Sequence, residues 1–179
     1  LMTLYHMEPF VSWGHFELNR TLFPRGIEGM RTCAEKAQAM GIRLGAHVLT
    51  NFIQMNDPYI TPVPDPRLMK TGSSSLVDDI DTARKEITIA SPEFFDNEAA
   101  NWLHTVVIDQ ELIRYRADSK HHPWILQDCE RGAFGTKAAA HQANAAVGKL
   151  ADHPYKIFFP NIDLQNEIAR NLAKRFNET

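Results

Sequence analysis

The chain contains 179 residues, of which 44% are hydrophobic and 23% charged, and its formal net charge is −3. This length suits one ordinary domain and is too short for a complete eight-fold (β/α) barrel, which takes roughly 250 residues. The slight negative charge argues against a nucleic-acid-binding protein, which usually carries a basic face. No apolar run in the sequence approaches the roughly 20 residues of a membrane span, and two cysteines cannot define a disulfide framework.

The first part of the chain has the pattern of a strand–helix–strand unit. Residues 3–10 predict a short strand that stops at Pro9, because proline cannot donate to a sheet ladder. Residues 26–40 place their apolar side chains on one helical face, and Gly41 follows where a left-handed helix terminator belongs. Residues 42–49 form a near-continuous apolar run, which is typical of a strand buried on both faces. We therefore expect two parallel strands joined by a right-handed crossover.

A proline-rich connector then leads into a segment of β character. Four prolines between residues 58 and 66 exclude a helix or a central strand there. The alternation of apolar and polar residues beyond the connector predicts short strands at 86–89, 105–108, 111–115 and 124–126. Asp109-Gln110 is the expected tight turn between two of them. Short strands at this spacing suggest a small barrel or sandwich, inserted into a βα pattern.

The last part of the chain returns to the earlier pattern. Residues 155–159 (YKIFF) have the composition of a buried strand, and residues 162–177 predict a helix that Asn161 or Asp163 caps. The predicted fold class is α/β, a partial (β/α) barrel of βαβ units with an inserted small antiparallel β domain. The predicted domains are a barrel segment at 1–66, the inserted β-rich module at 67–152, and a return to the barrel at 153–179.

Two motifs carry a resemblance to a known family. They are W-G-H-F-x-L-N-x-x-x-F-P-R-G-I-x-G-M at 13–30 and A-x-x-M-G-I-R-L-G-A-H at 37–47. Both resemble the second and third βα units of α-galactosidase-like glycoside hydrolases, which are TIM-barrel enzymes. The run H-V-L-T-N-F-I-x-x-N-D-P-Y-I-T-P-V-P-D-P-R-L at 47–68 resembles a bacterial subgroup with a domain inserted after this strand. The resemblance implies an oligosaccharide or polysaccharide substrate and a periplasmic or secreted protein.

The same resemblance bears on the catalytic residues. In that family the nucleophilic aspartate ends the next barrel strand, and the acid follows further on. Because the present chain opens inside an apolar segment and closes in a helix without a stop signal, we expect a fragment of a larger protein. Both catalytic carboxylates are then expected beyond residue 179, and none is assigned within the chain.

The inserted segment carries a second resemblance. The motifs D-x-E-L-I-R-Y at 109–115 and C-E-R-G-A-F-G-T-K-A-A-A-H-Q-A-N-A-A-V at 129–147 resemble a small β module that is also found in phage tail proteins. The usual pattern ends with a glycine where Asn144 stands here, and asparagine tolerates left-handed conformations. We interpret the signature as a structural turn held by side-chain hydrogen bonds, with a ligand or partner surface as the alternative. Its residues are Arg131, Gly132, Gly135, Thr136 and His141.

Six residues are candidate substrate contacts: Glu8, Trp13, His15, His47, Asn51 and Asp57. The resemblance implies that an acidic residue at the position of Glu8 contacts sugar hydroxyls. An aromatic ring can stack on a sugar face, so Trp13 is either a platform for substrate or a packing residue. His47 is either a core histidine or a substrate contact. Asp57 precedes proline, and turn formation is the favoured interpretation.

The remaining residues favour no other chemistry. The sequence has eight histidines but no H-x-x-x-H or C-x-x-C spacing, so we predict no metal site and expect no cofactor. Cys33 is interpreted as a buried small hydrophobe. The predicted function is a share in glycoside hydrolysis, which uses two carboxylates. The alternative is a non-catalytic carbohydrate-binding or assembly module built on the β insert, and exposed apolar faces also suggest self-association.

Overall fold

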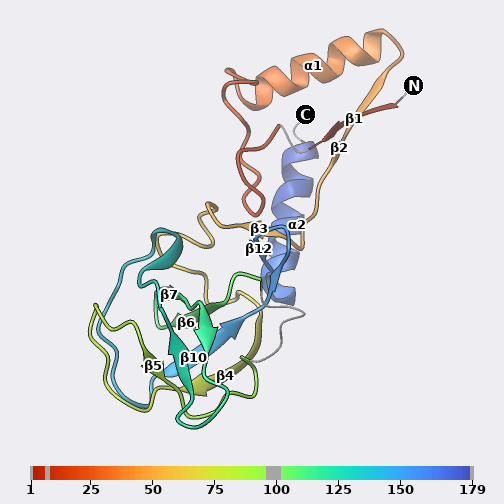
Figure 1. Ribbon diagram of the computed structural model, residues 1–179. Coiled ribbons are helices and arrows are strands. Elements are labelled where there is room, and N and C mark those ends of the chain that lie inside the picture. Colours follow the sequence, from red (N-terminus) through yellow and green to blue (C-terminus); the bar gives the residue numbers. More distant parts are fainter. Residues whose placement is uncertain (1, 7–8, 96–101, 178–179) are drawn as a thin grey trace.

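The computed structural model describes residues 2–6, 9–95 and 102–177. A β-rich region occupies one end of the molecule, and helix α1 (Ile27–Ala39) lies at the opposite end (Figure 1). Helix α2 (Ile162–Asn177) runs between the two ends. Asn161 caps α2, because its side-chain oxygen accepts a hydrogen bond of 2.9 Å from the backbone N–H of Leu164.

The predicted strand–helix–strand unit is present at the α1 end. Strands β1 (Met2–His6) and β2 (Arg43–His47) pair in parallel, and α1 lies between them in the chain. Gly41 ends the helix with φ 74°, as the sequence predicts. The expected burial of β2 on both faces is wrong, since its residues are half-buried or exposed. The described residues give β2 one partner strand, β1, and so one of its edges stays unpaired.

A four-stranded antiparallel sheet forms the centre of the β-rich region. Its order is β4 (Lys70–Ser75), β10 (Ala146–Leu150), β6 (Thr105–Ile108) and β7 (Glu111–Arg114). Ile108 pairs with Glu111, so Asp109 and Gln110 form the predicted tight turn between β6 and β7. Asp109 has φ 51°, a left-handed conformation that two-residue hairpin turns require.

Two three-stranded antiparallel sheets complete the described strands. One has the order β5 (Ile87–Thr88), β9 (Ile125–Gln127) and β8 (Ala117–Asp118). The other has the order β11 (Asp152–His153), β12 (Ile157–Phe158) and β3 (Ile53–Gln54). A short 3-10 turn covers Ala133–Gly135. In this second sheet, β12 from the end of the β-rich segment pairs with β3, which precedes that segment in the sequence.

The predicted partial (β/α) barrel is wrong. Across the described residues β1 and β2 are the one parallel pair, and every other ladder is antiparallel. Strand β12, which was expected to return to a barrel, pairs antiparallel with β3 and β11 instead. A parallel neighbour requires a crossover of a dozen or more residues, whereas the β11–β12 connection spans three residues, 154–156.

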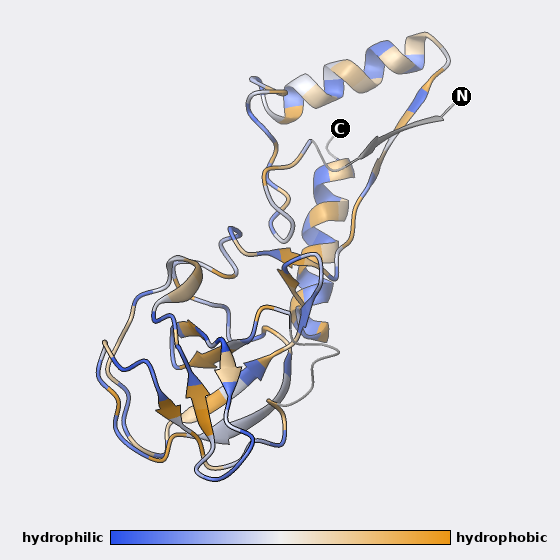
Figure 2. Ribbon diagram, viewed as in Figure 1, coloured by the Kyte–Doolittle hydropathy of each residue, from blue (hydrophilic) through white to orange (hydrophobic). Residues whose placement is uncertain are grey.

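Two groups of buried side chains hold these elements together. In the first, α2 packs Leu164, Ile168 and Leu172 against β12 and against aromatic residues of the 10–16 loop. The second lies between the sheets of the β-rich region and includes Ile87, Val106, Ile113, Leu126 and Val147. Figure 2 shows apolar residues on these strands and in stripes along both helices. Burial of this apolar surface is the main stabilising contribution to both regions.

Candidate functional site: the Asp57 cluster

A fully buried carboxylate, that of Asp57, joins two segments that lie far apart in the sequence. It accepts hydrogen bonds from the Ser12 hydroxyl at 2.7 Å, from the His15 backbone N–H at 2.8 Å and from the Tyr59 backbone N–H at 3.0 Å. A fourth contact, at 2.7 Å, reaches Nδ1 of the His15 ring. We call Ser12, His15, Asp57 and Tyr59 the Asp57 cluster. Asp57 also starts the predicted turn, since its carbonyl accepts from the Ile60 N–H at 2.8 Å.

The approach of the 12–15 loop to this carboxylate depends on Gly14. Gly14 has φ 122°, which is outside the range of most L-residues. A Cβ atom at this position would lie 2.6 Å from Cγ of Asp57. The absence of a side chain therefore lets the loop fold closely around the buried carboxylate.

The His15 ring is held in a defined orientation. Its side chain is 34% exposed, and the ring stacks on Tyr59 with centroids 3.9 Å apart. An ionised carboxylate can only accept hydrogen bonds, so Nδ1 donates to Asp57. In the neutral ring Nε2 is then the acceptor atom, and within the described residues no hydrogen bond engages it. The arrangement presents an oriented imidazole with one vacant acceptor.

A network of charged residues ties this cluster to α2. The Tyr59 hydroxyl donates to Glu167 at 2.9 Å, and Arg67 donates to both Glu167 at 2.6 Å and Asp65 at 2.8 Å. The hydrogen bond from Arg67, followed by that from Tyr59, holds the pKa of Glu167 below its usual value. Burial alone would raise the pKa of Asp65, but the hydrogen bonds and charge of Arg67 outweigh it and lower the pKa. Both carboxyl groups are therefore ionised at neutral pH.

The other candidate contacts are dispersed. Trp13 is buried and stacks on Phe52 with centroids 5.8 Å apart, so its ring packs in the core and no face is available to a sugar. His47 ends β2 at an exposed position, and Asn51 is half-buried in the following turn. Glu8 lies outside the described residues. The structure thus brings Trp13, His15 and Asp57 into one region, with His15 alone partly exposed.

The signature of the inserted segment forms the structural turn that the sequence predicts. Arg131 donates to both oxygens of the buried Glu111 carboxylate at 2.9 and 2.8 Å, and Nε2 of His141 lies 2.8 Å from it. Nδ1 of His141 lies 2.8 Å from Asp109. The predicted left-handed residue also occurs, since Asn144 has φ 67°. Sequence reasoning missed Glu111 as the centre of this cluster, although it belongs to the quoted motif.

The Glu111 carboxylate is saturated by this arrangement. Besides its side-chain partners, it accepts from the backbone N–H groups of Gly132 at 2.8 Å and Ala139 at 3.0 Å. Burial would raise the pKa of Glu111, but these hydrogen bonds, led by that from Arg131, lower it below the usual value. A carboxylate with so many partners has a structural role and is a poor general acid.

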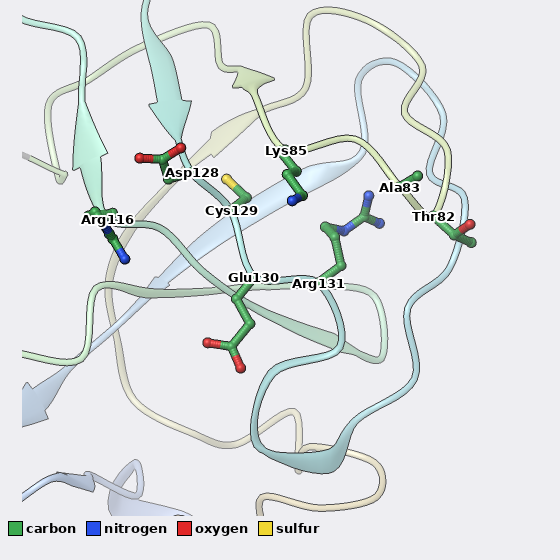
Figure 3. A pocket seen from close by; sticks show the side chains of 8 residues that line it. All are labelled: Thr82, Ala83, Lys85, Arg116, Asp128, Cys129, Glu130 and Arg131. Carbon is green, nitrogen blue, oxygen red and sulfur yellow. The ribbon is translucent and has the colours of Figure 1, made fainter.

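A polar pocket of about 600 Å³ opens beside this cluster (Figure 3). Lys85, Arg116 and Arg131 line it together with Asp128 and Glu130. The Arg131 guanidinium already forms an ion pair with Glu111. Cys129 also lines the pocket, and burial raises the pKa of its thiol to about 12, so the reactive thiolate is scarce at neutral pH. The pocket therefore contains no activated nucleophile among the described residues.

Comparisons with protein families, with curated proteins and with solved structures found no match to this chain. Neither helix in the described ranges is long and apolar enough to cross a membrane. The described residues also contain no group of three or more His, Cys, Asp or Glu side chains that could hold a metal ion.

Proposed function

We propose that this chain contributes substrate contacts to a carbohydrate-active glycoside hydrolase, and that His15 is the contact made by the Asp57 cluster. One observation supports the proposal. The two segments that carry the glycosidase resemblance, residues 13–30 and 47–68, meet at the Asp57 carboxylate, and their meeting orients the one partly exposed side chain of the cluster.

The chemistry of an oriented imidazole suits a sugar hydroxyl. Nδ1 of His15 donates to Asp57, which leaves Nε2 to accept a hydrogen bond from an O–H group. Stacking on Tyr59 restricts the ring before any ligand arrives. A side chain that is already ordered loses less conformational entropy on binding, so more of the hydrogen-bond energy contributes to affinity.

The carboxylates next to the cluster suit a positioning role better than a catalytic one. Glycoside hydrolysis needs a carboxylic acid that donates a proton to the leaving oxygen. Asp65 and Glu167 are held ionised by Arg67, and Asp57 is enclosed by four contacts. None of the three is arranged as a proton donor, so we assign substrate contact, not acid catalysis, to this region.

The test is an NMR titration of the chain with neutral galacto-oligosaccharides, which measures the Kd of binding. His15→Ala is expected to raise the Kd about tenfold, because one hydrogen bond to a ligand hydroxyl is lost. The matched control is His121→Ala, which removes an exposed histidine from the β-rich region. Equal affinity of the His15→Ala variant and the wild type would remove His15 from the site, and no binding by the wild type would refute the proposal.

A further inference from the structure

A small cavity between the β-rich region and the β11–β12 turn combines aromatic rings with positive charge. Its volume is about 220 Å³, and Trp102, Phe134, Arg114 and Lys156 are among the residues that line it. The lining includes two cationic side chains and no anionic one, although the whole chain has a net charge of −3. We propose that this cavity binds one acidic sugar residue, a hexuronate, within an oligosaccharide.

The aromatic part of the cavity is exposed and its backbone is fixed. Trp102 is 55% exposed, which is unusual for so large an apolar side chain. The backbone N–H groups of Trp102 and Leu103 donate to the buried Asp152 carboxylate at 2.5 and 3.1 Å. Asp152 therefore fixes the backbone of Trp102, and the indole ring is available to stack on the apolar face of a sugar.

The cationic part is also ordered and only weakly neutralised. The Arg114 guanidinium lies 5.5 Å from the centroid of the Phe134 ring, and its Nε donates to the Leu103 carbonyl at 3.2 Å. Its ion pair with Glu130 is long, at 3.5 Å, and both side chains are substantially exposed. Such a pair contributes little and can give way to a ligand. Lys156 is exposed and has no ion pair within the described residues.

These features select a carboxylated sugar over other ligands. A planar guanidinium binds a carboxylate through two parallel N–H donors, and a neighbouring lysine adds a point charge. The aromatic ring distinguishes the ligand from an inorganic anion. The volume lies below the roughly 300–1,000 Å³ of pockets for drug-sized molecules, so it suits one ring with its substituents. This inference does not depend on His15, which lies outside the cavity lining.

The test is a titration of the 179-residue chain with digalacturonate, with galactobiose as the neutral comparison. Trp102 is the most exposed of the three tryptophans, so we expect bound digalacturonate to change the tryptophan fluorescence. Lys156→Gln is expected to raise the Kd for digalacturonate about tenfold, since a charge-assisted contact is lost. Trp102→Phe, which keeps an aromatic ring, is expected to bind while losing the fluorescence change.

One control variant and two alternative ligands test whether the cavity selects an acidic sugar. Lys85→Gln removes an exposed cation of the pocket in Figure 3 and is expected to leave the Kd for digalacturonate unchanged. Galactobiose bound as tightly as digalacturonate and weakened equally by Lys156→Gln would overturn the acidic-sugar assignment. Adenosine monophosphate bound with equal affinity and weakened equally by Lys156→Gln would overturn it in favour of a nucleotide. If Lys156→Gln left the Kd for digalacturonate unchanged, the cavity would not be the binding site.

Discussion

At the scale of single residues, Gly14 combines an unusual backbone conformation with a close approach to a buried side chain. Its φ of 122° strains any L-residue, and a Cβ atom would come within 2.6–2.8 Å of three atoms of the Asp57 carboxyl group. We predict that Gly14→Ala lowers the free energy of unfolding by roughly 1–3 kcal/mol, the usual cost of a strained backbone position. Urea unfolding followed by circular dichroism measures the change.

Gly29 provides the matched control for this substitution. It lies inside α1, where an added Cβ would meet its nearest atom at 3.7 Å, an ordinary contact. Gly29→Ala is expected to leave stability unchanged or to raise it by about 0.5–1 kcal/mol, because alanine favours a helix. A Gly14→Ala variant as stable as Gly29→Ala would show that the 12–15 loop does not fold closely around Asp57.

The candidate site could be predicted from single residues only in part. A proline after Asp57 signals a turn locally, and that turn forms. The bond to His15 joins residues 42 positions apart, and no local pattern encodes such a pairing. Trp13 was open to two interpretations because a tryptophan has the same sequence signal whether it faces solvent or a core; stacking on Phe52 decides for the core.

At the scale of elements, the cap of α2 can be tested directly. Asn161 accepts the hydrogen bond from the N–H of Leu164, a donor with no partner inside the helix. We predict that Asn161→Ala destabilises the protein by about 1 kcal/mol. Asn166→Ala is the control, because Asn166 is exposed in the second turn of α2 and alanine is the better helix former. Thermal unfolding of the two variants with equal midpoints would contradict a capping role for Asn161.

The bounds of helices and strands were easier to predict than the pairing of the strands. Helix α2 and strand β6 have the predicted bounds because periodicity and caps are local signals. Strand pairing is set by distant residues. The YKIFF run has the composition of a buried strand and was assigned to the barrel, yet Ile157 and Phe158 lie in an antiparallel sheet against Ile53 and Gln54. Composition reports burial, which is correct for both residues, but it does not report strand direction.

At the scale of the whole molecule, the same limit explains the wrong fold class. The β1–α1–β2 unit is common to many α/β folds, and extending it to a barrel required further parallel strands. The described residues supply antiparallel sheets instead. Besides the apolar cores, buried and half-buried charge clusters link distant segments, such as Glu111 with Arg131 and Glu167 with Arg67. These clusters determine how the stability of the molecule responds to pH.

Glu111, Asp65 and Glu167 all have a lower pKa in the folded protein than the usual carboxyl value. The unfolded chain therefore binds more protons at acidic pH, and stability must fall as the pH decreases. Their contribution is complete above the ordinary Glu value of 4.5 and is lost as the pH falls through the lower folded values. We predict that the free energy of unfolding, measured by urea titration between pH 7 and pH 3, decreases most steeply below about pH 4.5.

The contribution of one carboxyl group can be separated from the total by substitution. Glu167→Gln keeps an acceptor for Tyr59 and Arg67 but has no titrating proton, so the slope of unfolding free energy against pH should become shallower. Glu28→Gln removes a carboxylate that pairs with Arg31 on the surface of α1, where both partners are exposed. Exposed pairs contribute little, so this control should keep the wild-type slope. If Glu167→Gln also kept that slope, the link between α2 and the Asp57 cluster would not depend on an ionised Glu167.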